Sequence, residues 1–301
     1  MKKIDISIAR KMVNLLNKYI QLRNPETKDK WERNFSNNVT KLEFETGNGF
    51  KINLYNDSLL SKLIYCGFED NEVTFITNLV KPGDIFFDIG ANIGFHSLNA
   101  MTVLKNSGAI YAFEPTPSTY NRLLENIQLN NGEKLIHAFN LGLSDKNEKL
   151  MLNTSSNGHD AWNSFAKLEH VNMDNEVLVN VIRLDEFISK QQIEIDKISL
   201  IKIDVEGWEL MVLDGMETLF LNQNFRAYFL IEFTEENAFR AGYSCRDIYN
   251  YMLSRGYKWF SYDTTINKLV PSPLKAYYPY ENLIAVKEGQ PGSVHNLLLN
   301  L

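Results

Sequence analysis

The pattern of hydrophobic and polar positions changes near residue 84. Before it, apolar side chains recur at intervals near 3.6 over 1–35, which predicts an amphipathic helix. Over 39–56 apolar and polar residues alternate on both sides of a Thr-Gly-Asn-Gly turn, which predicts a β-hairpin. Helical spacing returns over 70–80. We therefore expect 1–80 to form a helical and hairpin extension. Its first helix is expected to pack on the main domain, with a dimer contact or a lid as the alternatives.

After residue 84, short apolar runs alternate with amphipathic stretches. The predicted strands cover 85–88, 109–113, 135–139, 198–203, 227–232, 257–262 and 282–287. The predicted helices cover 94–105, 117–130, 208–220 and 245–255. Nearly continuous apolar runs such as 200–203 are typical of strands buried on both faces. The pattern predicts an α/β domain over 81–301, with a doubly wound, mostly parallel sheet and helices on both sides. Residues 146–184 interrupt it as an insertion of two strands around a polar loop.

Composition and charge narrow the function classes. The 301 residues are 44% hydrophobic and 23% charged, which is ordinary for a globular chain with a sizeable core. The formal charge is −6 and the sequence has no basic cluster free of acids, so we expect no nucleic-acid partner. It has no apolar run long enough to span a bilayer, no secretory signal at its amino end, and only Cys66 and Cys245 as cysteines. These features predict a cytoplasmic protein and leave a homo-oligomer open.

A glycine-containing loop follows the first strand of the alternating region and opens a helix. Its sequence is Asp88-Ile89-Gly90-Ala91-Asn92-Ile93-Gly94. Glycines allow the backbone to approach a ligand closely, and the start of a helix offers unpaired N–H groups. A dinucleotide loop would carry a glycine where Asn92 stands, and the acidic Asp88 disfavours a phosphate. The loop therefore favours a cationic ligand such as S-adenosylmethionine, with an ordinary strand-to-helix turn as the alternative.

Acidic residues also follow two other predicted strands. Glu114, which precedes Pro115, ends the second strand, where a carboxylate can accept hydrogen bonds from both ribose hydroxyls of a nucleoside. Asp204 and Glu206 follow the strand over 198–203. Because open α/β sheets bind ligands at the carboxyl ends of their strands, we expect these acids to line one pocket.

Taken together, the motifs resemble the FkbM-type family of S-adenosylmethionine-dependent methyltransferases over residues 60–235. The resemblance is carried by the glycine loop, Phe113-Glu114-Pro115, Leu143-Ser144-Asp145 and Ile203-Asp204-Val205-Glu206-Gly207-Trp208-Glu209. It implies the class I methyltransferase fold, a Rossmann-like, doubly wound sheet of seven strands with a reversed last strand. It also implies that the glycine loop holds the methionine part of the cofactor, that Glu114 holds the ribose, and that Ser144 and Asp145 lie near the adenine. The family mostly methylates oxygen on sugars, polyketides and related natural products.

Methyl transfer to a hydroxyl needs a group that takes the hydroxyl proton. Asp204 is the best-placed candidate, because in this fold the fourth strand ends beside the methyl group. Glu206, Glu232 at the end of the fifth strand, and His159 in the insertion loop are the rivals. Asp204 and Glu232 together could also hold one Mg²⁺, since hard cations take carboxylate oxygens, although no third ligand is evident from the sequence.

The expected function is therefore O-methylation of a small-molecule or glycan acceptor. An N-methyltransferase for a small molecule would share the cofactor site, but the chain lacks the Asn/Asp-Pro-Pro-aromatic motif common among such enzymes. A nicotinamide oxidoreductase is disfavoured by the missing middle glycine. A non-catalytic nucleoside-binding module is the remaining alternative, and it is disfavoured because Asp88, Glu114 and Asp204 are all retained.

Overall fold

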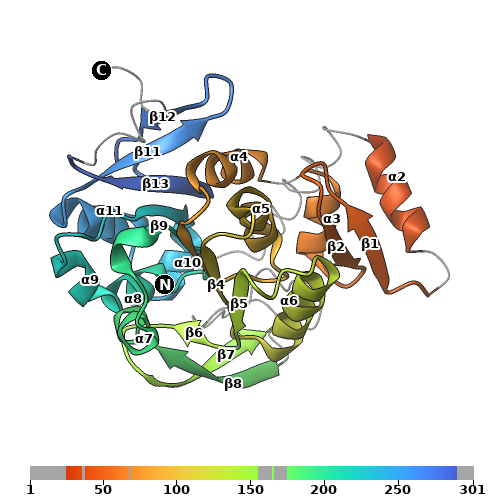
Figure 1. Cartoon of the computed structure of the whole chain (residues 1–301), viewed down its shortest axis with the longest axis horizontal. Coiled ribbons are helices and arrows are strands. Elements are labelled where there is room, and N and C mark those ends of the chain that lie inside the picture. The colour runs from red at the N-terminus through yellow and green to blue at the C-terminus, as the bar shows by residue number, and fades with distance from the viewer. Residues whose placement is uncertain (1–24, 36–37, 68, 155–164, 166–174, 290–301) are drawn as a thin grey trace, which may run out of the picture.

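The computed structural model describes residues 25–35, 38–67, 69–154, 165 and 175–289 (Figure 1). The helix predicted over 1–35 enters this part of the chain only as α2 (Pro25–Asn34). The tip of the predicted insertion, which contains His159, lies outside the described residues. Among the residues that are described, no helix combines the length and the apolar character needed to cross a membrane.

The centre of the molecule is an eight-stranded sheet with the order β12-β11-β13-β10-β9-β3-β4-β5 (Figure 1). Its strands are β3 (Ile85–Ile89), β4 (Ala109–Phe113), β5 (Ile136–Phe139), β9 (Ile198–Ile203), β10 (Tyr228–Phe233), β11 (Tyr257–Asp263), β12 (Lys268–Pro271) and β13 (Glu281–Lys287). From β5 to β10 every neighbouring pair is parallel, whereas β13 runs antiparallel to both β10 and β11. This order and the reversed β13 confirm the predicted class I arrangement. The structure adds β12, an eighth strand that pairs with β11 at the edge.

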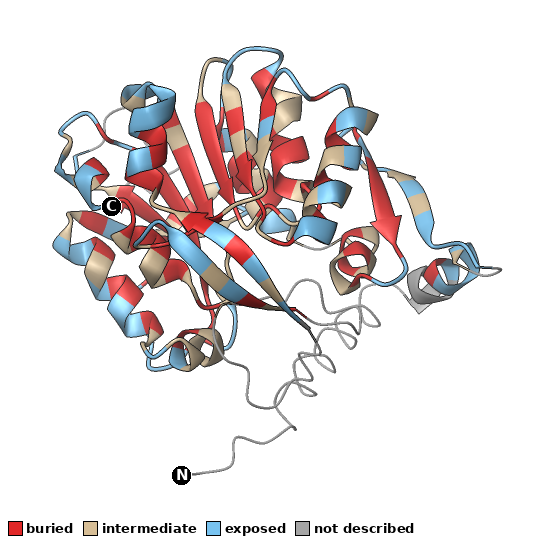
Figure 2. Ribbon diagram, turned by 90° about the horizontal axis from the view of Figure 1, so that it is seen from below, coloured by how far each residue is buried: buried red, intermediate tan, exposed pale blue. Residues whose placement is uncertain are grey.

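Helices cover both faces of this sheet and form two separate cores. Phe86 and Phe87 show why, because successive side chains of a strand point to opposite faces and each phenylalanine belongs to a different core. The Phe86 side is covered by α4 (Asp70–Leu79), α5 (Phe95–Leu104) and α6 (Pro117–Leu129), and α3 (Leu59–Tyr65) extends this core toward the amino-terminal hairpin. The Phe87 side is covered by α7 (Leu184–Gln191), α8 (Glu209–Asp214), α9 (Glu217–Leu221), α10 (Glu235–Arg240) and α11 (Cys245–Ser254). Figure 2 shows the strands as a buried band between the partly exposed helices.

The helix predicted over 208–220 is divided in two. A Cβ atom on Gly215 would lie 2.0 Å from the carbonyl oxygen of Ser144, and the Gly215 carbonyl accepts a hydrogen bond from the Asp185 N–H. These contacts hold the chain between α8 and α9. The short helices α3 and α10 were also not predicted, because segments of six or seven residues carry too little periodicity to be recognised.

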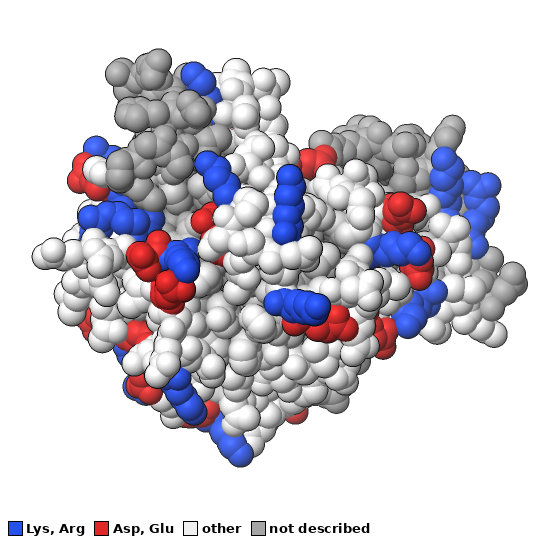
Figure 3. Space-filling view, in the orientation of Figure 1, with Lys and Arg blue, Asp and Glu red and all other residues white. Residues whose placement is uncertain are grey.

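Two smaller sheets flank the main one. The predicted hairpin forms from β1 (Lys41–Glu45) and β2 (Lys51–Tyr55), and the Asn53 N–H donates to Asn126 Oδ1 of α6 at 2.7 Å. The insertion contributes β7 (Glu148–Thr154) and β8 (Asn175–Ile182), which join β6 (Gly142–Leu143) in a three-stranded sheet. On the face shown in Figure 3, Lys and Arg side chains are interspersed with Asp and Glu.

Candidate functional site

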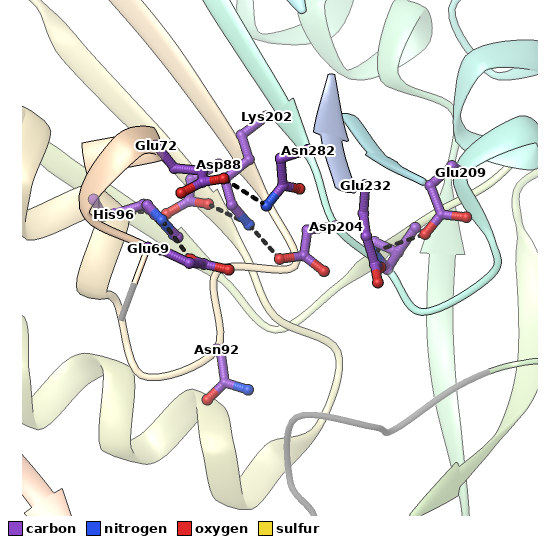
Figure 4. A network of polar contacts seen from close by, with 12 residues as sticks. Glu69, Glu72, Asp88, Asn92, His96, Lys202, Asp204, Glu209, Glu232 and Asn282 are labelled. Atoms are coloured by element: carbon purple, nitrogen blue, oxygen red, sulfur yellow. Dashed lines mark hydrogen bonds and ion pairs between the residues drawn. The ribbon is translucent and has the colours of Figure 1, made fainter. Parts of the chain in front are cut away.

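Strand register places a row of polar side chains on the sheet face that α4 and α5 cover. Asp88 of β3 lies beside Lys202 of β9, and Glu232 of β10 lies beside Asn282 of β13. Side chains two residues apart on a strand share a face, so this row continues the apolar positions of the first core, such as Leu230. Asp88, Lys202 and Glu232 are buried. Polar groups that the sequence scatters over four strands therefore meet at one edge (Figure 4).

Lys202 lies between two carboxylates in this row. Its Nζ is 2.9 Å from Asp204 Oδ2 and 3.9 Å from Asp88 Oδ1. Ser97 Oγ of α5 donates to Asp88 Oδ2 at 2.6 Å. Burial alone would lower the pKa of Lys202, but the carboxylates of Asp204 and Asp88 raise it above its ordinary value, so the ammonium group stays charged. Sequence reasoning missed this residue, although one charge inside an apolar strand is a recognisable signal.

Three carboxylates converge next to this lysine. Asp204, Glu206 and Glu232 each offer an oxygen, and these oxygens lie within 4.8 Å of one another. Thr234 Oγ1 donates to Glu232 Oε1 at 2.6 Å, while Glu232 Oε2 has no hydrogen-bond partner among the described residues. Burial, followed by the neighbouring carboxylates, raises the pKa of both Glu206 and Glu232 well above the usual range. A carboxyl group in such a site can hold or accept a proton closer to neutral pH.

The turn after β9 gives Glu206 its position. Its backbone is left-handed, with φ 52°, and the next residue, Gly207, has φ 97°. A Cβ atom on Gly207 would lie 2.5 Å from the carbonyl oxygen of Asn237, so only glycine fits there. Asn237 Nδ2 in turn donates to Glu206 Oε2 at 2.7 Å. Glu209 points back into the turn, and its Oε1 accepts the Gly207 N–H at 3.0 Å.

The glycine loop lies directly against the end of β9. Gly90 has φ 79°, and a Cβ atom there would lie 1.8 Å from the carbonyl oxygen of Asp204. The Asp204 N–H donates to the Ile89 carbonyl at 3.1 Å, and Gly94, also left-handed, is the N-cap of α5. The loop predicted to hold the cofactor and the strand predicted to carry the base are therefore in backbone contact.

Glu114 links the glycine loop to the start of α6. Its Oε2 accepts the Asn92 N–H at 3.2 Å and its Oε1 accepts the Thr116 N–H at 2.8 Å. Asn140 Nδ2 donates to the carbonyls of Glu114 and Pro115 at 2.9 and 2.8 Å, which fixes the chain after β4. The carboxylate is buried and organises the backbone on both sides of the strand end.

Ser144 and Asp145 lie at the end of β6. Ser144 is fully buried, donates from Oγ to Asp145 Oδ1 at 3.1 Å, and accepts a hydrogen bond from Trp208 Nε1 at 3.1 Å. Trp208 belongs to the fourth motif, and its bond to Ser144 connects the end of β6 to the start of α8. Two separately recognised motifs are in direct side-chain contact.

A second group of buried side chains adjoins the row from the side of α4. His96 Nε2 of α5 lies 2.9 Å from Glu69 Oε2, and Tyr280 Oη donates to Glu69 Oε1 at 2.7 Å. Burial alone would raise the pKa of Glu69, but His96, Lys202 and Tyr280 together lower it below its ordinary value. Asn282 Nδ2 donates to Glu72 Oε1 at 3.2 Å. The sequence carries no signal for these partners, because Glu69 and Tyr280 are more than 200 residues apart.

The predicted site residues therefore form two adjoining groups. The first group lies along the ends of β3, β9 and β10 and consists of Asp88, Asp204, Glu206 and Glu232. Lys202 connects Asp88 to Asp204. Glu114 and the glycine loop lie at the ends of β3 and β4, and the Gly90–Asp204 contact joins the two groups.

Comparison with known proteins identifies the family of the chain. The family model described as the methyltransferase FkbM domain matches residues 88–259, which is more than half of the chain. The hexuronic acid methyltransferase AglP of Haloferax volcanii is 29% identical over 157 residues, which cover 52% of this chain and 60% of that protein. The 31-O-demethyl-FK506 methyltransferase FkbM of Streptomyces tacrolimicus is 28% identical over 163 residues, covering 46% of this chain and 61% of that protein.

The aligned segments thus span only about three fifths of these two relatives. Among solved structures, a SAM-dependent O-methyltransferase from Thermotoga maritima matches with 13% identity and a TM-score of 0.40, over 83% of this chain and 79% of that one. The family match confirms the resemblance drawn from the four motifs. The chain belongs to the FkbM methyltransferase family.

Proposed function

We propose that this protein transfers the methyl group of S-adenosylmethionine to a hydroxyl of a sugar, a glycan or a related natural product. The observation that carries the proposal is the contact between Gly90 and Asp204, which joins the glycine loop to the three-carboxylate cluster. The names of the relatives from Haloferax volcanii and Streptomyces tacrolimicus, a hexuronic acid methyltransferase and a 31-O-demethyl-FK506 methyltransferase, support the acceptor classes.

The cofactor is assigned to the group around the glycine loop. In this proposal the loop from Asp88 to Gly94 binds the methionine part and Glu114 binds the ribose. Ser144 and Asp145 lie beside the adenine. Asp88 would act through other residues, because its side chain is fully buried between Ser97 and Lys202. The backbone bonds to Glu114 would hold the loop in shape for the ligand.

The reaction is an in-line displacement in which the acceptor oxygen attacks the methyl carbon. The new C–O bond forms as the C–S bond breaks, and the sulfur keeps the electron pair of that bond as a neutral thioether. The hydroxyl proton passes to a carboxylate. We assign this role to Glu232 or Glu206, whose pKa values are raised, with Asp204, which forms an ion pair with Lys202, as the alternative.

The insertion over 146–184 is assigned to acceptor binding, with His159 kept as a candidate for contact with the acceptor or its proton. We also include in the proposal a divalent cation such as Mg²⁺, held by carboxylates of the cluster.

Calorimetry with S-adenosylmethionine and with NAD tests the cofactor assignment. We expect binding of S-adenosylmethionine and no binding of NAD, and the reverse result would overturn the proposal. Methyl transfer is then measured with labelled cofactor against hexuronic acids, neutral sugars and macrolide alcohols. The panel also includes amines. Label found on nitrogen would show that the protein is an N-methyltransferase.

A further inference from the structure

We propose that Asp204, Glu206 and Glu232 form a binding site for one hard divalent cation. The three residues come from two neighbouring strand ends, β9 and β10, and each offers a carboxylate oxygen within 4.8 Å of the other two. The site supplies the third ligand, Glu206, that sequence reasoning did not find. The role given to the ion below rests on the proposed function, whereas the site itself does not.

The spacing of the oxygens suits one ion. Three oxygens spread evenly around one Ca²⁺ lie about 4.0–4.5 Å apart, and three around one Mg²⁺ lie about 3.5–3.6 Å apart. The carboxylate oxygens lie within 4.8 Å of one another, so small side-chain movements bring them to a shared Ca²⁺. Mg²⁺ requires the three side chains to close further.

Glu232 provides an independent indication of a ligand. It is 3% exposed, yet its Oε2 has no hydrogen-bond partner among the described residues. A buried carboxylate oxygen left in this state is costly unless something binds it. Thr234 holds the other oxygen at 2.6 Å, so the carboxylate is fixed in orientation next to Asp204 (Figure 4).

The charge balance of the cluster favours a cation. Lys202 contacts Asp204, but the same ammonium group also lies near Asp88. Arg240 favours the ionised form of Glu206, but burial and the carboxylates of Asp204 and Glu209 oppose it more strongly. The three carboxylates also repel one another, and a divalent ion held between them would offset that repulsion.

The open side of the site leaves room for an acceptor. The Asp204 side chain is 25% exposed, so an ion bound there keeps coordination positions for water or for a substrate hydroxyl. Such an ion would lower the pKa of a bound hydroxyl and orient it toward the cofactor methyl group. A vicinal diol or a hydroxy acid, both of which occur in hexuronic acids, could chelate it through two oxygens.

The test is a titration of the full chain, saturated with S-adenosylhomocysteine, with Mn²⁺. Binding is measured as the loss of the EPR signal of the free ion. We expect one ion per chain, displaced by Mg²⁺ or Ca²⁺. Glu232→Gln and Glu206→Gln should each weaken binding by at least about tenfold, because each removes a charged ligand. The control Glu236→Gln, which changes a nearby acid on α10, should bind Mn²⁺ like the unmodified protein.

Calorimetry with S-adenosylhomocysteine on each variant shows whether the variant is folded. If Glu232→Gln does not fold, Glu206→Gln carries the test, since Glu206 lies in the turn after β9 and is less buried than Glu232. Absence of Mn²⁺ binding, or equal binding by the folded variants, would overturn the inference and leave cofactor binding untouched. Failure of the unmodified protein to bind S-adenosylhomocysteine would instead overturn the proposed function.

Discussion

Gly90 and Asp204 are in van der Waals contact through their backbones, so closely that a methyl group on Gly90 would lie 1.8 Å from the Asp204 carbonyl oxygen. This contact sets the distance between the glycine loop and the carboxylate cluster. Any side chain at position 90 would push the two apart.

Gly90→Ala is expected to destabilise the protein by about 3 kcal/mol or more, because alanine meets both the overlap with Asp204 and the positive φ. Urea unfolding followed by circular dichroism measures the change. The matched control is Gly47→Ala in the β1–β2 turn, where a Cβ atom has no neighbour within 4 Å. Equal unfolding midpoints for the two variants would show that the Gly90 contact is not tight in solution.

Glu114→Gln tests the link between the glycine loop and α6. The amide group of glutamine turns a donor toward either the Asn92 N–H or the Thr116 N–H, so one of the two backbone bonds is lost. We expect affinity for S-adenosylmethionine to fall by at least about tenfold, which corresponds to about 1.4 kcal/mol. Calorimetry compares this variant with Glu133→Gln, an exposed acid after α6. An unchanged dissociation constant would remove Glu114 from the cofactor site.

Lys202→Met tests whether the buried lysine stabilises the fold through its ion pairs with Asp88 and Asp204. Methionine keeps much of the volume, but it leaves Asp88 and Asp204 without their shared cation. Removing one partner of a buried ion pair typically costs about 3–5 kcal/mol, and we expect a loss of that size in urea unfolding. Lys197→Met, which breaks an exposed pair with Glu194, serves as the control and should leave the midpoint unchanged. Similar midpoints for both variants would contradict the structural role of Lys202.

Asp185→Asn tests a pH-dependent contribution on the other sheet face. Burial alone would raise the pKa of Asp185, but hydrogen bonds from Arg183 and Thr218 lower it below the ordinary value. A lowered pKa means that the ionised group stabilises the fold above its unfolded pKa of about 3.9, and that this contribution is lost as the pH falls through the folded value.

At neutral pH we therefore expect the asparagine variant to be less stable by about 1–3 kcal/mol. The difference in melting temperature should stay constant from about pH 7 to about pH 5 and shrink as the pH is lowered further to about 2. The exposed acid Asp196 gives the matched control, Asp196→Asn. A difference that stays constant down to about pH 2 would show that Asp185 does not titrate with folding.

Much of the architecture followed from local pattern. The strands of the main sheet were recognisable because they are short apolar runs between turn residues, and the start of α6 was marked by Thr116 and Pro117. The helix predicted over 208–220 was wrong in its continuity, because the packing of Gly215 on Ser144 is a contact between distant segments.

The sequence by itself determined which residues end the buried strands, and hence that Asp88, Glu114, Asp204 and Glu232 lie at one edge of the sheet. Only the tertiary structure decided which of these acids face one another, since strand register and backbone turns depend on packing between segments far apart in the chain. It placed Lys202 beside Asp88, turned Glu206 toward Glu232 through a left-handed backbone, and directed Glu209 back into its own turn. A side chain's partners are a property of three-dimensional contact, which no one-dimensional pattern encodes.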